Sequence, residues 1–209
     1  TGGQITLNSV SVALSGTAAD VAAALDGSFA ASYTGDVSLT DGHDLPQLKA
    51  INAGTSGDIT LFSSTTALSG SAADITAGLT GISGYAGAVT ASGTQTGSAG
   101  VTAVNALGTA TAGVVTATVS GTAAELASLS TAGTDMIAVT VSNPHDLAKL
   151  KAINNATGGT ITLNDASVAL SGSAADIAAA LAGISGYTGA VTASGTQTGS
   201  SGVTAVNTL

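Results

Sequence analysis

The feature that most constrains this chain is a long internal repeat. Residues 43–107 align without a gap on residues 145–209, an offset of 102 residues, and 48 of the 65 aligned positions are identical. A second match places the segment that starts at Gly3 on the segment that starts at Gly159. Such self-similarity is typical of proteins in which each repeat packs against its neighbours along the chain.

Helix starts mark a shorter period inside this repeat. A Ser, Thr or Asp side chain accepts a hydrogen bond from a free N–H at a helix N-terminus, and an acidic residue three positions later strengthens the signal. Pro46 supports the start at Asp44, because proline is tolerated in the first turn of a helix. The predicted helix starts are spaced 24 or 27 residues apart, near Thr17, Asp44, Ser71, Ser98, Thr122, Asp146, Ser173 and Ser200.

Each predicted helix has about ten residues, with apolar side chains on one face and many alanines elsewhere. Between the helices, short runs of alternating apolar and polar residues predict one strand per repeat. In the repeats that contain Ser11 and Ser167, a second short extended piece is expected before the helix. The predicted strands begin at Ile5, Val37, Ile59, Val89, Val115, Ile137, Ile161 and Val191.

A strand–helix repeat of 24–27 residues cannot bury its own apolar face, so about eight of them have to stack. The connection from strand through helix to the next strand should be right-handed, and the strands parallel. The sequence therefore predicts a right-handed α/β solenoid that runs continuously through residues 1–209. It has a parallel sheet on one side and short Ala-rich helices on the other. Paired strands are more closely spaced than packed helices, so small residues at the helix contacts and a curvature or superhelical twist are expected to absorb the mismatch.

Composition excludes several classes of function. The chain has three Lys and no Arg against 12 acidic residues, a formal charge of -9, so it lacks the positive surface that binds nucleic acid. It has no Cys, which excludes disulfides, thiolate metal sites and cysteine nucleophiles. We expect no membrane span, because no stretch of about 18 consecutive apolar residues occurs, and no signal peptide is recognisable.

Residue patterns that carry chemistry are weak in this chain. Half of the acidic residues fall at predicted helix starts, where the helix dipole favours them. His43 and His145 each precede an Asp that begins a helix and are expected to be turn residues. No G-x-S-x-G motif stands beside a histidine, and no Lys follows the glycine-rich G-T-Q-T-G-S segments. We therefore expect no enzyme, no catalytic residue and no cofactor, and calcium at turn aspartates such as Asp41 and Asp165 is the open alternative.

One surface pattern remains. If the first apolar residue of each strand points inward, the residues an odd number of positions after it point outward. The outward residues are then a row of hydroxyl side chains: Thr6, Ser38, Thr60, Thr90, Thr116, Thr140, Thr162 and Thr192. Threonine combines β-propensity with solubility, so the row has a structural explanation. The alternative is a flat ladder that binds ice or a polysaccharide.

The tandem runs of the type L-S-G-[ST]-A-A-[DE], followed by G-Y-T-G-A-V-T, resemble the repeat regions of very large bacterial cell-surface and secreted proteins, cyanobacterial ones among them. The resemblance covers the whole chain and implies an extracellular structural or adhesive role, but it carries over no site residues. Our leading expectation is a segment of an extracellular fibre, surface layer or giant adhesin. The alternatives are a module that binds ice or glycan and a viral tail-fibre segment.

Neither end of the chain carries the atypical polar repeat that usually caps a solenoid. This predicts either a longer array or copies that stack end to end. The expected partners are therefore neighbouring copies or adjoining repeats, together with glycan or the cell surface.

Overall fold

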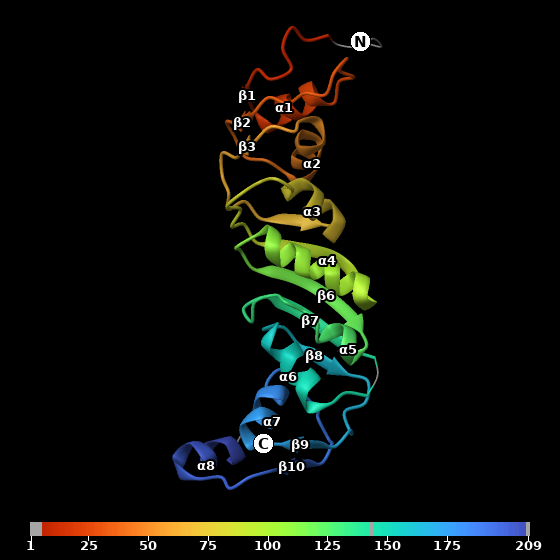
Figure 1. Ribbon diagram of the computed structural model, residues 1–209, viewed down its shortest axis with the longest axis vertical. Coiled ribbons are helices and arrows are strands. Elements are labelled where there is room, and N and C mark those ends of the chain that lie inside the picture. The colour runs from red at the N-terminus through yellow and green to blue at the C-terminus, as the bar shows by residue number, and fades with distance from the viewer. Residues whose placement is uncertain (1–5, 143, 208–209) are drawn as a thin grey trace. The chain divides into compact units, whose positions relative to one another are not determined.

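The computed structural model describes residues 6–142 and 144–207 (Figure 1). Over these residues the chain has an α/β fold with parallel sheets, built from ten strands and eight helices. The strands are β1 (Leu14–Gly16), β2 (Val37–Leu39), β3 (Ile59–Thr60), β4 (Leu68–Gly70), β5 (Val89–Thr96), β6 (Val115–Gly121), β7 (Met136–Val141), β8 (Ile161–Leu163), β9 (Leu170–Gly172) and β10 (Val191–Ala193). The helices are α1 (Ala18–Leu25), α2 (Leu45–Gly54), α3 (Ala72–Leu79), α4 (Gly97–Ala110), α5 (Ala123–Leu126), α6 (Leu147–Asn155), α7 (Ala174–Leu181) and α8 (Gly199–Asn207).

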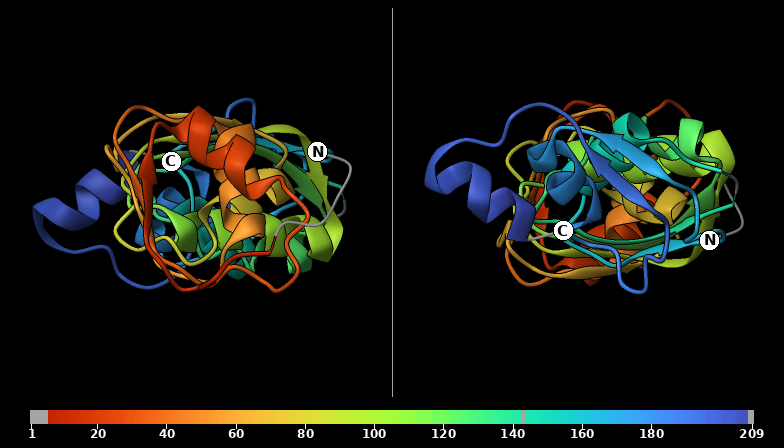
Figure 2. Two further views of the ribbon diagram at one scale, coloured as in Figure 1. Left: turned by 90° about the horizontal axis from the view of Figure 1, so that it is seen from above. Right: turned by 90° about the horizontal axis from the view of Figure 1, so that it is seen from below.

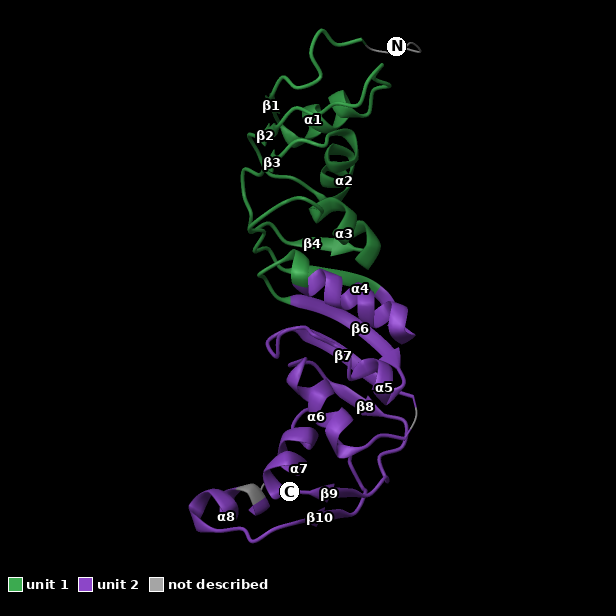
Figure 3. Cartoon of the chain, in the orientation of Figure 1, with its two compact units in different colours: residues 1–92, 109–114 green, residues 93–108, 115–209 purple. Residues whose placement is uncertain are grey.

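The chain divides into two compact units, coloured in Figure 3. Unit 1 comprises residues 1–92 and 109–114, and unit 2 comprises residues 93–108 and 115–209. The boundary passes through β5 and α4, close to Ser98, where the spacing of the predicted helix starts changes from 27 to 24 residues. Each unit contains parallel strands and packed helices of its own.

Six of the eight predicted helix starts are confirmed. In each case the predicted side chain accepts a hydrogen bond from the N–H three residues later, as the chemistry of N-capping requires. In α2 and α5 the third helical residue, Gln47 or Glu125, also bonds back to the cap. The confirmed N-caps are Thr17, Asp44, Ser71, Thr122, Asp146 and Ser173.

The two helices predicted to start at Ser98 and Ser200 begin one residue earlier than these serines. Helix α4 begins at Gly97 and α8 at Gly199, so each serine is the second residue of its helix. Gly97 and Gly199 have φ values of 60° and 69°. This left-handed conformation is open to glycine without a steric penalty, so a glycine turn rather than a serine cap marks the start of these two helices.

Seven of the eight predicted strands are present, as β2, β3, β5, β6, β7, β8 and β10. The first is not: Ile5 lies outside the described residues, and Thr6 and Leu7 belong to no strand. The extended pieces expected before two helices are confirmed as β1 and β9. Strand β4 is a third such piece, which the sequence prediction did not include.

The strands pair in parallel with their neighbours along the chain, and the pairing is interrupted once within each unit. In unit 1, β1, β2 and β3 pair in that order and β4 pairs with β5. In unit 2, β6, β7 and β8 pair in order and β9 pairs with β10. Among the described residues, β3 does not pair with β4, nor β8 with β9. Both β3 and β8 are followed by another strand before the next helix. The strand after β8 is the expected second piece, β9, whereas β4 after β3 departs from the predicted one strand per repeat.

The helices pack on their neighbours along the chain (Figures 1 and 2). In unit 1, α2 contacts α1 and α3, and in unit 2, α6 contacts α5 and α7 while α7 also contacts α8. Most helices have eight to ten residues, close to the predicted length, but α5 has four and α4 has 14. The core draws on both strands and helices, and it includes Val21, Val37, Leu48, Ile51 and Ile75 in unit 1 and Val119, Leu126, Val139, Leu150 and Ile177 in unit 2.

A tyrosine–carbonyl bond recurs three times and was not anticipated. The hydroxyl of each tyrosine donates to a backbone carbonyl two residues before an L-S-G strand: Tyr33 to Val12, Tyr85 to Thr66 and Tyr187 to Val168. A glycine follows two residues after each tyrosine, at positions 35, 87 and 189. A Cβ at any of these glycines would lie within 2.4 Å of the accepting carbonyl oxygen. The Y-x-G sequence is therefore required by this close approach.

We predict that Gly87→Ala destabilises the fold. A Cβ on Gly87 would lie 2.1 Å from the Thr66 carbonyl oxygen and 2.8 Å from the Tyr85 hydroxyl. Overpacking together with a lost hydrogen bond should lower the free energy of unfolding by roughly 2–4 kcal/mol, measured by urea unfolding followed by circular dichroism. Gly42→Ala is the matched control, because nothing lies within 4 Å of a Cβ there. Equal stability of the two variants would contradict the role of the tyrosine–carbonyl bond.

Candidate functional site

Hydroxyl side chains lie in short rows across the strands. Ser15, Ser38 and Thr60 are aligned across β1, β2 and β3 in unit 1, and all three are exposed. In unit 2, Ser120, Thr140 and Thr162 are aligned across β6, β7 and β8. Two shorter pairs are Ser69 with Thr90 and Ser171 with Thr192. Within either unit, an aligned row spans three strands at most.

The ladder predicted from the sequence is corrected in its members. Thr116 is aligned with Met136 and not with Thr140, and Thr6 belongs to no strand. Serines of the L-S-G strands, which the predicted ladder did not include, are members of the observed rows.

The reason for this difference is the position from which the register is counted. In β1, β4, β6 and β9 the sequence [LV]-S-G-[ST] puts an apolar residue three positions before the helix N-cap. Val119 is that residue in β6, and it is aligned with Val139 and Ile161. The predicted ladder took its residue in β6 from Val115, which lies four residues before Val119. The strand therefore takes its register from the adjoining helix start.

The two candidate cation ligands are engaged in bonds to the chain itself. Asp41 Oδ1 accepts a hydrogen bond from the Ala18 N–H at 2.7 Å. Asp165 accepts bonds from the N–H and the hydroxyl of Ser167, which lower the pKa of its carboxyl group. Within residues 6–142 and 144–207, no three His, Asp or Glu side chains come together as a metal site would require. The geometry of these two residues is that of turn and helix-end stabilisation.

Both histidines, which were expected to be turn residues before a helix N-cap, are buried. His43 and His145 are each 6% exposed, and neither ring nitrogen of either residue has a hydrogen-bond partner among the described residues. The ring of His43 lies 6.4 Å from that of Tyr85, and His145 lies 6.4 Å from Tyr187. Burial lowers the pKa of both histidines, opposed in part by Asp44 and Asp41 near His43 and by Asp165 and Asp146 near His145.

Burial also affects the tyrosines of these pairs. It raises the pKa of Tyr85 to about 12 and raises that of Tyr187 as well. Tyrosine is neutral at physiological pH in any case, and burial disfavours its charged form further. Neither imidazole has, among the described residues, the hydrogen-bonded partner that orients a general base in a catalytic pair.

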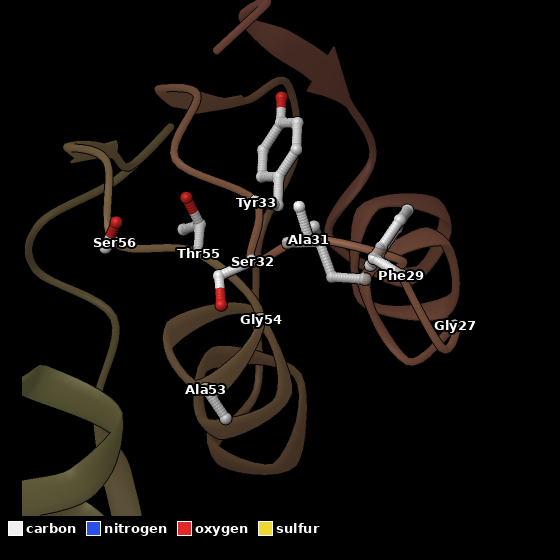
Figure 4. Close-up of a pocket in the computed structure, with 10 residues that line it drawn as sticks. Gly27, Phe29, Ala31, Ser32, Tyr33, Ala53, Gly54, Thr55 and Ser56 are labelled. Carbon is white, nitrogen blue, oxygen red and sulfur yellow. The ribbon is translucent and has the colours of Figure 1, made fainter. Parts of the chain in front are cut away.

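A cavity of 410 Å³ opens in unit 1 between the ends of α1 and α2 (Figure 4). Phe29 and Tyr33 form part of its wall, with ring centres 6.2 Å apart. The other lining residues are mostly small, and Tyr33 is the one titratable side chain among them. Its hydroxyl is already bonded to the Val12 carbonyl. The cavity therefore contains no pair of groups suited to acid–base or nucleophilic chemistry.

The most regular polar arrangement joins successive helices. Asn52 on α2 donates from Nδ2 to the carbonyl of Ala77 at 2.8 Å, and Asn105 on α4 donates to that of Ser128 at 2.9 Å. Asn154 on α6 makes the same bond to Ala179. Each accepting carbonyl lies six residues after the N-cap of the next helix. We call this the asparagine bridge, and it links every second helix to the one that follows.

Threonines after three helices make a second kind of bond between repeats. The hydroxyl of Thr55 donates to the Gly35 carbonyl at 2.8 Å, and that of Thr111 donates to the Gly87 carbonyl at 2.7 Å. Thr157 donates to the Ile137 carbonyl at 2.8 Å. Each threonine hydroxyl oxygen also accepts a hydrogen bond from the N–H of the glycine two residues later. The T-x-G sequence therefore links neighbouring repeats through the threonine side chain.

Lysines add charge pairs at the same junctions. Lys49 on α2 bonds to Asp74 in the first turn of α3, and Lys151 on α6 bonds to Asp176 in the first turn of α7. These bonds lower the pKa of both carboxyl groups. The pairs are about half exposed, so they contribute less than the buried bonds. What the sequence analysis missed is thus a set of Asn, Tyr and Thr side chains, and the signal was their recurrence at fixed positions beside each helix.

We predict that stability falls as the pH drops from 7.5 to 5. The folded state holds both histidines with a lowered pKa, so the unfolded chain binds more protons below about pH 6.5, and linkage then favours unfolding. The double variant His43→Phe/His145→Phe should flatten this dependence in urea unfolding series. The carboxylates with lowered pKa titrate below about pH 4 and lie outside the window. An unchanged slope in the double variant would show that other groups are responsible.

Within the described residues, no helix combines the length and the hydropathy needed to cross a membrane. Comparisons with protein-family models, with curated proteins and with solved structures find no match to this chain.

Proposed function

We propose that this chain is a non-enzymatic structural segment of an extracellular bacterial fibre, surface layer or giant adhesin. In this proposal its strand–helix repeats follow one another as a right-handed α/β solenoid. The segment provides length, and its partners are adjoining repeats or further copies of the same chain. The Ser and Thr side chains on its strands then serve mainly as a soluble outer surface.

One observation carries the proposal: the asparagine bridge is made in the same way at three junctions. An arrangement that recurs at alternate junctions builds a chain of similar interfaces, and similar interfaces propagate a core along an axis. The tyrosine–carbonyl bonds and the threonine bonds support the same conclusion, because they also recur at fixed positions. A catalytic site, by contrast, would concentrate distinct residues at one place.

Composition supports an extracellular setting for this segment. The chain contains no Cys and so has no thiol to oxidise, and 12 acidic residues against three Lys favour solubility. Its L-S-G-[ST]-A-A-[DE] runs resemble repeats of large bacterial surface proteins, as noted above for the sequence.

Small-angle X-ray scattering of the purified chain tests the proposal. A compact domain of this length has a radius of gyration of about 17 Å. A solenoid should give a clearly larger value, with a distance distribution that is skewed towards long distances. A value near that of the compact domain, with a symmetric distribution, would contradict the proposal.

A further inference from the structure

The two copies of one sequence differ in exposure. Residues 89–107 and 191–209 are identical at 17 of 19 positions. In the first copy Val89, Val101 and Val104 are at most 3% exposed. The equivalent Val191, Val203 and Val206 are 37%, 59% and 45% exposed. The face formed by β10 and α8 therefore presents apolar side chains that the same sequence buries elsewhere in this chain.

Unit 2 shows what lies against the first copy. The β6–α5 repeat lies next to α4, where the Asn105 side chain donates to the Ser128 carbonyl and accepts the Ser130 N–H at 2.8 Å. At the other end of α4, a Cβ on Gly121 would lie 3.5 Å from Gly97 Cα. The cover of α4 in unit 2 thus includes a strand–helix repeat with the sequence V-S-G-T-A-A-E-L, residues 119–126.

A matching repeat exists at the other end of the described chain. Residues 14–21 read L-S-G-T-A-A-D-V, with five identities to residues 119–126 and similar residues at the other three positions. The N-caps Thr17 and Thr122 have nearly the same backbone angles, φ -64° and ψ 152° against φ -71° and ψ 154°. Among the described residues, β1 pairs with β2 alone and β10 pairs with β9 alone. Each strand therefore has one edge available for parallel pairing.

We infer that a second copy of this chain docks its β1–α1 repeat on the β10–α8 face of the first, head to tail. Val191, Val203 and Val206 are covered in this contact. Asn207, which is equivalent to Asn105 and exposed, makes an asparagine bridge to the second copy's Ala23 carbonyl, six residues after the N-cap Thr17. The two surfaces differ, so the contact does not close on itself and adds copies in a line.

This inference rests on the proposed function and names its partner surface. The two can fail separately. A monomer with an extended scattering profile would leave the structural role in place and overturn the head-to-tail contact. A compact scattering profile would contradict the structural role, and with it the contact that rests on that role.

Sedimentation velocity over a range of concentrations tests the contact. The unaltered chain should form a ladder of oligomers. The double variant Val203→Lys/Val206→Lys should need at least a tenfold higher concentration to reach the same mean mass, with an unchanged circular dichroism spectrum. Phe62→Lys is the matched control, because Phe62 is 66% exposed and lies outside both surfaces. A monomer at all concentrations, or equal assembly of all three proteins, would overturn the inference.

Cross-linking tests the orientation. The chain has no Cys, so a short thiol-reactive cross-linker will join only introduced thiols. Mixing the Asn207→Cys and Ala23→Cys chains should give a product that links the two variants. A product from Asn207→Cys alone would indicate a symmetric dimer through α8 and would overturn the head-to-tail arrangement. Asn207→Ala should weaken assembly and leave thermal stability unchanged, whereas Asn105→Ala should lower thermal stability.

Discussion

Packed helices lie about 8–10 Å apart and paired strands about 4.8 Å apart, and every strand–helix repeat has to reconcile the two spacings. Small residues bring the helices closer: a Cβ on Gly54 would lie 2.5 Å from Leu25 Cβ, and one on Gly78 would lie 3.0 Å from Leu45 Cδ1. The pairing of the strands is interrupted between β3 and β4 and between β8 and β9. Within each unit, this allows the helix layer to keep its spacing without stretching a sheet.

Short helices raise a second requirement. A helix leaves about four N–H and four C=O groups without partners at its ends, which is a large share of an eight-residue helix. In this chain the side chains of a neighbouring repeat satisfy several of them. Asn52 bonds to the carbonyls of Ala77 and Thr80 near the end of α3, and Asp41 accepts the first N–H of α1. The repeats thus complete one another's hydrogen bonding as well as one another's core.

Local chemistry was enough to predict most of the helix starts and strands. N-cap residues located six helix starts, and alternation located seven strands, because both signals depend on neighbours in sequence. The starts of α4 at Gly97 and of α8 at Gly199 were missed, because the backbone angle φ of a glycine cannot be inferred from its residue type. The register of β6 was also missed, because it depends on the turn to α5. The burial of His43 against Tyr85 could not be predicted, since it depends on two loops meeting across more than forty residues.

The bonds between repeats are made mostly to backbone carbonyls. Asn105, Tyr85 and Thr55 each recognise an oxygen that every amino acid carries, so the side chain at the accepting position is free to vary. Ser128 accepts the same bond as Ala77 and Ala179, although its side chain differs from theirs. A gene for such a chain could gain or lose whole repeats by recombination without matched changes in the adjoining ones. The array could change its length faster than its surface chemistry.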